Sequence, residues 1–219
     1  MSTSINSKCW YVEVCSNPTC NTCIKYPVIK SLMNMSGVPE TLHTPITLTC
    51  GKEDMEQFKR LQEIKNDVDG LVEDGGNLFI CSEQAGNGKT SWAIKIMYKL
   101  FELEWQSWGP IDPLGMFIYV PEFLTRLKDF NNPLPSSYLE SIKKAPLVIW
   151  DDIGAGKISE YDYTQLLIYI NARQMAGKAN IYTSNYIKLD KLAEQIGSRL
   201  ASRIFTASEI IELKGKDRR

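Results

Sequence analysis

From Asn77 onward the chain alternates short apolar runs with amphipathic helical patterns, and this alternation limits its possible folds more than any other feature. Short apolar runs with helical crossovers between them are typical of a buried parallel sheet. The predicted strands are Leu78–Cys81, Met116–Val120, Leu147–Trp150, Asn180–Thr183 and Glu209–Leu213. The predicted helices are Lys89–Glu104, Glu122–Phe130, Glu160–Ala176 and Leu189–Gln195. The sequence therefore predicts an α/β fold with a parallel sheet and flanking helices.

The region before Asn77 has a different character. A cysteine-rich segment at residues 9–23 precedes a predicted helix over Ile24–Met35. Another helix is predicted over Met55–Val72, where apolar residues recur at steps of three or four. We therefore divide the chain into an N-terminal module, residues 1–50, and a catalytic domain, residues 51–219.

The overall composition narrows the classes of partner. The 219 residues include 25 basic and 26 acidic side chains, a formal net charge of −1, so no global positive field attracts nucleic acid. Any DNA binding must then come from local patches or from assembly. The chain begins with a polar segment and contains no run of about 18 apolar residues. We expect a soluble intracellular protein without a membrane partner.

The most informative motif is a glycine loop, Gly86-Asn-Gly-Lys-Thr90, between a predicted strand and a predicted helix. Its glycines allow the backbone N–H groups to turn inward around phosphates, and the helix N-terminus adds roughly half a positive charge. Lys89 would neutralise the β- and γ-phosphates, and the Thr90 hydroxyl would ligate Mg²⁺. The predicted nucleotide-binding residues are Gly86, Asn87, Gly88, Lys89, Thr90 and Ser91.

This loop departs from the usual phosphate-binding pattern at one position. Glu83 stands where that pattern opens with glycine, so the first turn must use ordinary backbone angles. Because this position leaves the strand and need not touch phosphate, the departure weakens the prediction without overturning it.

A second motif, Pro146–Asp152, consists of four apolar residues followed by two carboxylates. A buried parallel strand delivers such acids to the carboxyl edge of the sheet, where ligands bind in these folds. Asp151 would hold Mg²⁺, and Asp152 would orient or deprotonate an attacking water. The alternative is an acidic turn after a core strand; the glycine loop earlier in the chain favours the functional interpretation.

Two further segments carry candidate catalytic residues. Asn185 follows a predicted strand and would reach the γ-phosphate or the water, although a turn or helix cap before Leu189 explains it equally well. Arg199 and Arg203 lie four residues apart, on one face of a short predicted helix. Such arginines can stabilise transition-state charge across a subunit boundary, although most arginines on helix faces are simply solvated.

Together these four segments resemble the AAA+ helicase loaders of the DnaC and DnaI type, including forms carried by bacteriophages. The similarity extends from about Asp54 to Arg219. The resemblance implies that Asn185 is the sensor I residue and that Arg203 is the trans-acting arginine finger, with Arg199 as its substitute. The matching segments are Gly86–Thr90, Ile149–Asp152, Tyr182–Asn185 and Ser198–Arg203.

The resemblance also implies an activity and partners. Such loaders are ATPases that hydrolyse ATP to ADP and phosphate, and ATP acts as a switch for assembly and release during DNA replication. Their N-terminal module binds the hexameric replicative helicase, while the ATPase module self-associates into an oligomer and contacts single-stranded DNA. The segment Ile211–Arg218, next to the last residue of the sequence, looks like the close of loaders without a helical lid and favours a loader over an initiator.

The N-terminal cysteines predict a zinc site. Four thiols within fifteen residues would bind a tetrahedral Zn²⁺, although only the last pair has a common zinc spacing. The alternative is a partner-binding arm with reduced free thiols. Cys81 stands apart in an apolar run and is expected to be an inert core residue. The predicted zinc ligands are Cys9, Cys15, Cys20 and Cys23.

Other functions remain open at this stage. A transposition ATPase of the IstB kind shares the same core, but the cysteine-rich start favours a loader. A small-molecule kinase is disfavoured because no arginine-rich lid is evident. A zinc adaptor with a degenerate nucleotide site would be consistent with Glu83.

For DNA contact, the stretches that combine basic and aromatic residues are Phe123–Phe130 and Lys157–Tyr163, and amphipathic packing explains the first equally well.

Overall fold

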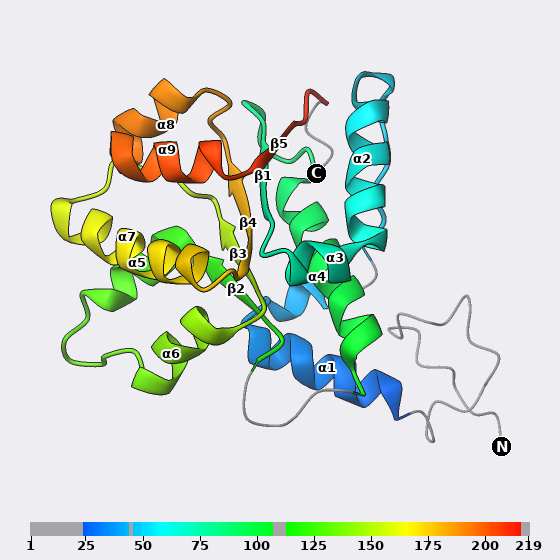
Figure 1. The fold of residues 1–219 in the computed structure, drawn as a ribbon, viewed down its shortest axis with the longest axis horizontal. Helices are drawn as coiled ribbons and strands as arrows, with labels where there is room; N and C mark the ends of the chain where they lie inside the picture. The colour runs from blue at the N-terminus through cyan, green and yellow to red at the C-terminus, as the bar shows by residue number, and fades with distance from the viewer. Residues whose placement is uncertain (1–23, 44–45, 107–112, 216–219) are drawn as a thin grey trace, which may run out of the picture.

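Five parallel strands form the centre of the computed structural model, which describes residues 24–43, 46–106 and 113–215 (Figure 1). Within these residues the strand order is β2-β3-β4-β1-β5, and every neighbouring pair runs parallel. The strands are β1 (Asn77–Cys81), β2 (Gly115–Tyr119), β3 (Leu147–Asp151), β4 (Ala179–Ser184) and β5 (Glu209–Glu212). Each predicted strand is confirmed to within one residue at both ends.

Helices cover both faces of the sheet (Figure 1). The first group packs on one face and the second group on the other, so the described chain has three layers. The first group is α1 (Lys25–Ser36), α2 (Met55–Asn66), α3 (Val68–Glu73) and α4 (Lys89–Glu104). The second group is α5 (Val120–Leu127), α6 (Ser136–Lys144), α7 (Glu160–Met175), α8 (Leu189–Ile196) and α9 (Ser198–Thr206). Two short 3₁₀ turns, η2 (Glu40–Leu42) and η3 (Lys52–Asp54), precede α2.

Alternate residues of each strand belong to different cores. On β1, Leu78 and Ile80 pack with α1 to α4, whereas Phe79 and Cys81 pack with α5 to α9. Successive side chains of a strand point to opposite faces, so a sheet covered on both sides needs apolar residues at every position. This explains why the strands appear in the sequence as continuous apolar runs.

Two helical predictions are wrong in detail. The single helix expected over Met55–Val72 is two helices, because the backbone of Asp67 leaves the helical region with φ −110° and ψ 36°. The helix expected over Glu122–Phe130 begins earlier, at Val120, because Pro121 occupies its first turn, where proline is favoured. Helix α6 was not predicted, because its sequence is largely polar and only Ile142 is buried.

The start and end of α7 match the prediction closely. The Ser159 side chain accepts a hydrogen bond from the backbone N–H of Asp162, and Asp162 in turn accepts from the Ser159 N–H. This reciprocal capping box satisfies two free N–H groups at the helix start.

Among the residues that the structure describes, none of the helices combines the length and the apolar character that a membrane span requires.

A buried carboxylate joins the region before α2 to the last described residues. The Asp54 side chain is fully buried, and its two oxygens accept the backbone N–H groups of Lys214 at 2.7 Å and Gly215 at 2.8 Å. Leu213 N–H also donates to the Cys81 carbonyl at 2.8 Å, which extends the pairing of β5 with β1. The segment after β5 is thus tied to η3, before α2, and to the end of β1.

Candidate nucleotide-binding site

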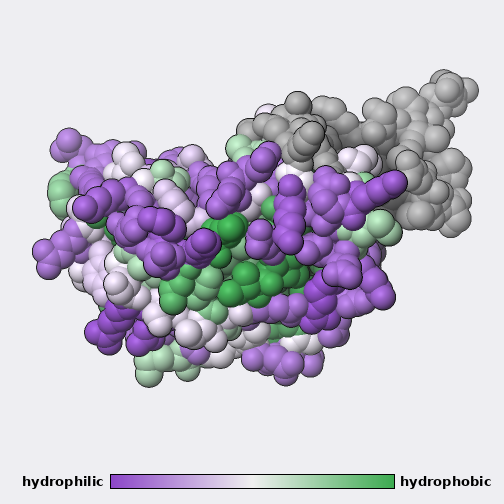
Figure 2. Space-filling view, turned by 90° about the horizontal axis from the view of Figure 1, so that it is seen from above, coloured by the Kyte–Doolittle hydropathy of each residue, from purple (hydrophilic) through white to green (hydrophobic). Residues whose placement is uncertain are grey.

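The candidate site lies at the edge of the sheet where the parallel strands end. In Figure 1 the strands run upward, and α4 begins close to the end of β1. Figure 2 looks onto this edge and shows apolar side chains in the middle of the face, with hydrophilic side chains around them. A ligand at this edge is therefore within reach of the loops that follow β1, β3 and β4.

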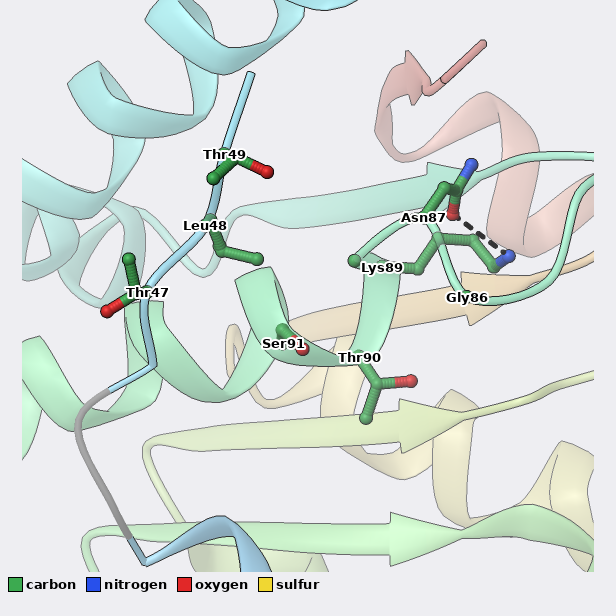
Figure 3. Close-up of a pocket in the computed structure, with 9 residues that line it drawn as sticks. Thr47, Leu48, Thr49, Gly86, Asn87, Lys89, Thr90 and Ser91 are labelled. Atoms are coloured by element: carbon green, nitrogen blue, oxygen red, sulfur yellow. Dashed lines mark hydrogen bonds between the residues drawn. The ribbon is translucent and has the colours of Figure 1, made fainter. Parts of the chain in front are cut away.

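The glycine loop surrounds one side of a cavity of about 480 Å³ (Figure 3). Gly86 and Gly88 have positive φ angles of 69° and 100°, a conformation that glycine adopts without steric cost. Glu83 is not among the residues with positive φ, as expected for a first turn with ordinary backbone angles. The cavity is lined by Thr47, Leu48, Thr49, Gly86, Asn87, Gly88, Lys89, Thr90 and Ser91.

Lys89 is buried, and its ammonium group points along the loop. Nζ donates hydrogen bonds to the Gln84 carbonyl at 2.8 Å and to Asn87 Oδ1 at 3.4 Å (Figure 3). Carbonyl and amide oxygens are neutral acceptors, and a phosphate oxygen binds an ammonium group more strongly. A triphosphate in the loop would therefore compete successfully for this lysine.

Thr90 and Asp151 meet although they are 61 positions apart in the chain. The Thr90 hydroxyl donates to Asp151 Oδ1 at 2.8 Å, and the Thr183 hydroxyl donates to the same oxygen at 2.7 Å. Burial raises the pKa of Asp151, while the two hydroxyl donors oppose that rise. Hydroxyl and carboxylate oxygens are ligands that Mg²⁺ prefers beside phosphate oxygens, so these residues fit that ion.

Asp152 is the one non-glycine residue with positive φ in the described ranges, at 59°. Its backbone N–H donates to Thr183 Oγ1 at 2.9 Å, and its Oδ1 accepts from Asn185 Nδ2 at 3.0 Å. Burial raises the pKa of Asp152, and the charge of Lys89 opposes that rise. The structure thus brings together Asp152 and Asn185, the two residues predicted to act on the attacking water.

Several residues of the site were missed by sequence reasoning. Thr183 supports both aspartates, and the signal for it was a small polar residue at the end of an otherwise apolar strand. The segment Thr47–Thr49 lines the cavity but carries no motif. Asn87 also has a structural task, because its Nδ2 donates to Ser82 Oγ and to the Leu213 carbonyl.

The two candidate arginines lie on α9, away from the residues that line this cavity. Arg199 is exposed, and Arg203 is half-buried with its guanidinium donating to Asn171 Oδ1 on α7. In the described parts of the chain neither forms an ion pair with a carboxylate. The geometry is consistent with a role toward a neighbouring subunit, which remains a prediction.

The aromatic and basic stretch proposed for DNA contact does not form one face. Phe123 is buried and packs edge-on against Trp150, whereas Phe130 is 83% exposed. Lys128 forms an ion pair with Asp162 at 2.7 Å. Helix packing therefore explains Phe123, as the alternative interpretation held.

The predicted zinc ligands Cys9, Cys15, Cys20 and Cys23 lie outside the described residues. The described ranges contain no cluster of three or more histidine, cysteine or acidic residues suited to a metal ion. Cys81 is confirmed as a core residue, since burial raises the pKa of its thiol to about 12.

The five-stranded parallel sheet, the glycine loop after β1 and the acids at the end of β3 together form an α/β fold with a candidate phosphate-binding loop. The chain is similar in sequence to the replicative helicase loader DnaI of Bacillus subtilis (strain 168), with 27% identity over 150 residues. That alignment covers 61% of this chain and 45% of DnaI, so the chain spans less than half of this relative. No model of a known protein family matches the chain.

Solved structures show the same fold. A crystal structure of the DnaC helicase loader matches with a TM-score of 0.64 and 19% identity, over 77% of this chain and 94% of that one. A crystal structure of DnaI matches with a TM-score of 0.61 and 21% identity, over 80% and 88% of the two chains. The resemblance to loaders of the DnaC and DnaI type, predicted from the motifs, is thus confirmed by sequence and by fold.

Proposed function

We propose that this chain is an ATPase that loads a replicative DNA helicase and uses ATP binding and hydrolysis as a switch for assembly and release. The observation that carries the proposal is the 2.8 Å contact between Thr90 and Asp151 beside the glycine-loop cavity. This contact supports the proposal because it brings together a hydroxyl and a carboxylate oxygen, which suit Mg²⁺, beside the loop expected to bind a triphosphate. The similarity to DnaI supports the choice of loading among the functions that such ATPases perform.

Each residue of the site has a distinct task in this proposal. The loop N–H groups and Lys89 would bind the phosphates, and Thr90 with Asp151 would hold Mg²⁺, whose charge would favour the transfer of the terminal phosphate. Asp152 orients and deprotonates the attacking water, and Asn185 holds Asp152 in place through its 3.0 Å hydrogen bond. Thr183 fixes the positions of both aspartates.

ATP binding and hydrolysis test the first part of the proposal. Wild-type protein is expected to bind ATP with Mg²⁺ in calorimetry and to hydrolyse it slowly. Lys89→Ala is expected to lower hydrolysis about a hundredfold, as loss of a transition-state donor does in other enzymes. Lys99→Ala is the control, because Lys99 lies on the same helix and pairs with Glu102. No ATP uptake at millimolar nucleotide would overturn the proposal.

Self-association would let Arg203, with Arg199 as substitute, complete the site of a neighbouring copy. Both arginines lie outside their own chain's cavity lining, and neither has a carboxylate partner in the described residues. A mixture of Arg203→Ala and Lys89→Ala subunits is expected to regain hydrolysis, because one mixed interface combines an intact lysine with an intact arginine. Two inactive variants that stay inactive when mixed would count against shared sites.

A hexameric helicase and single-stranded DNA are the proposed partners, and the bacterial cytoplasm is the proposed location. The DnaI similarity supports the helicase. Copurification with a replicative helicase is expected to depend on whether ATP or ADP is present. A chain that forms no complex in either nucleotide would refute loading while leaving the ATPase intact.

The N-terminal module, residues 1–50, is proposed to bind one Zn²⁺ through Cys9, Cys15, Cys20 and Cys23. Support comes from the density of thiols in residues 9–23, a stretch too short to bury a core of its own. Elemental analysis of protein purified without chelator is expected to find one zinc per chain and less in Cys20→Ser. An absence of zinc in the wild type would remove the proposal.

A further inference from the structure

Trp92 has an unusual environment near the start of α4. Its side chain is 3% exposed, and its indole Nε1–H is buried without a hydrogen-bond partner among the described residues. Phe58 packs edge-on against the ring at 5.2 Å, and Lys95 Nζ lies 5.7 Å from the ring centroid. Buried tryptophan N–H groups usually find a partner, so this donor calls for an explanation.

The N–H edge of this ring lies directly behind the lining of the cavity. Cδ1, which is bonded to Nε1, is 4.0 Å from the point that a Cβ on Gly88 would occupy, and Leu48 Cδ2 is 3.2 Å from the same point. Gly88 and Leu48 both line the cavity, and Leu48 is labelled in Figure 3. A ligand that moves the flexible Leu48 side chain would therefore meet the free indole N–H.

Two features indicate which part of a nucleotide meets Trp92. The phosphates belong at the loop amides and Lys89, whereas Leu48 gives the cavity an apolar surface on the side of segment 46–49, with the buried Trp92 packed behind it. Lys95 holds this segment by donating to the Ile46 carbonyl at 3.1 Å. A flat, largely apolar ring with hydrogen-bond acceptors at its edge fits that surface, and a phosphate does not.

We propose that Trp92 determines base specificity: its Nε1–H donates a hydrogen bond to a ring nitrogen of a purine bound in this cavity. The inference rests on the proposed function, because it assumes that the loop binds a nucleoside triphosphate. The donor is already removed from water in the protein, so the hydrogen bond with a matching acceptor carries only the desolvation cost of the acceptor. A base without an acceptor at that position leaves the donor unpaired and binds more weakly.

Trp92→Phe tests the proposal, because phenylalanine keeps an aromatic ring and removes only the N–H and the second ring. Calorimetry with Mg-ATP is expected to show binding about tenfold weaker in this variant. Trp105→Phe is the matched control at the far end of the same helix, about 20 Å away by helical rise. It is expected to bind like the wild type.

Purine analogues identify the acceptor. The 1-deaza, 3-deaza and 7-deaza forms of ATP each replace one ring nitrogen by carbon. One of them is expected to bind the wild type about tenfold more weakly than ATP and to bind Trp92→Phe as well as ATP does. A merely structural role for Trp92 would weaken all four nucleotides equally and show no such coupling.

The outcomes separate two kinds of failure. If the wild type binds ATP and Trp92→Phe binds it equally well, or if no analogue shows coupling, Trp92 is not the base-reading donor and the nucleotide site itself stands. If the folded wild type takes up no Mg-ATP, the proposed function fails first, and the inference fails with it. Circular dichroism of each variant confirms that the fold is retained.

Discussion

The two ends of the sheet bury charge in different ways. At the amino end, the fully buried Arg173 donates from Nε to Asn180 Oδ1 at 2.7 Å and from Nη1 to the carbonyls of Ile142 and Ala145 at 2.7 and 2.8 Å. Nη2 donates to the Ala179 carbonyl. All these acceptors are fixed by secondary structure or, for Asn180, by further hydrogen bonds, and burial lowers the pKa of the guanidinium to about 10.

At the carboxyl end, the buried charges have partners that a ligand can replace. Lys89 donates to loop oxygens, and Asp151 accepts from the Thr90 hydroxyl, while the Thr183 hydroxyl on β4 holds Asp151 in position. These groups line or adjoin an open cavity, whereas the partners of Arg173 belong to packed helix ends and strand starts. Buried charge alone therefore does not indicate a functional site. A buried charged group beside a cavity, with hydrogen-bond partners that a ligand can replace, is the better indicator.

The largest effect is expected at the amino end. Arg173→Met removes the donor from several buried carbonyls and should lower the free energy of unfolding by about 4 kcal/mol, because those acceptors lose their partners. Urea denaturation measures the loss, and Arg126→Met, at an exposed arginine, is the control. Unchanged stability would show that Arg173 does not hold this end of the sheet together.

Thr183→Val tests the carboxyl end of the sheet. The change keeps the side-chain volume but removes hydrogen bonds to Asp151 and to the Asp152 N–H, at an expected stability cost of about 2 kcal/mol. ATP hydrolysis should fall about tenfold as well, as happens when groups that orient metal ligands are removed. A variant that loses stability but keeps full hydrolysis would show that Thr183, like Arg173, stabilises the fold without acting in the candidate site. Thr125→Val, at an exposed helix position, is the control.

Asp54→Asn tests a buried carboxylate that belongs neither to the Arg173 cluster nor to the candidate nucleotide site. The amide keeps the shape but presents an NH₂ group to one of the two backbone N–H donors of Lys214 and Gly215. The expected loss of unfolding free energy is about 1.5 kcal/mol, typical of a charged hydrogen bond. Hydrogen exchange of these two amides should accelerate, and the exposed Asp74→Asn should leave both rates unchanged.

The smallest effect is expected on the surface, where Arg60 pairs with Glu209 at 2.6 Å. Arg60→Ala should cost less than about 1 kcal/mol and less still at high salt, because both side chains are about half exposed. The hydrogen bond from Arg60 lowers the pKa of Glu209, so this contribution is present at neutral pH and is lost as pH falls through the lowered value. A salt-independent or larger cost in chemical denaturation would contradict this ranking.

Local patterns were sufficient for much of the fold and for the chemistry of the loop. Continuous apolar runs predicted each strand to within one residue at both ends, because a sheet covered on both faces needs apolar side chains at every position. The glycines, Lys89, Thr90 and the two aspartates were predicted as ligands because phosphate and magnesium require those residue types in that order, and the structure brings Thr90 and Asp151 together. The same approach failed for α6, whose sequence buries a single residue, and for the break at Asp67.

The residue types at each position set the secondary structure and the candidate ligands of phosphate and magnesium. Only the folded chain showed that Thr183 supports both aspartates, that Asp54 holds the segment after β5, and that Trp92 has an unpaired N–H behind the cavity. These relations join positions far apart in sequence and depend on distances of a few ångström. Hydrogen bonding has so short a range that packing of the whole domain, and not any local pattern, decides which polar groups meet.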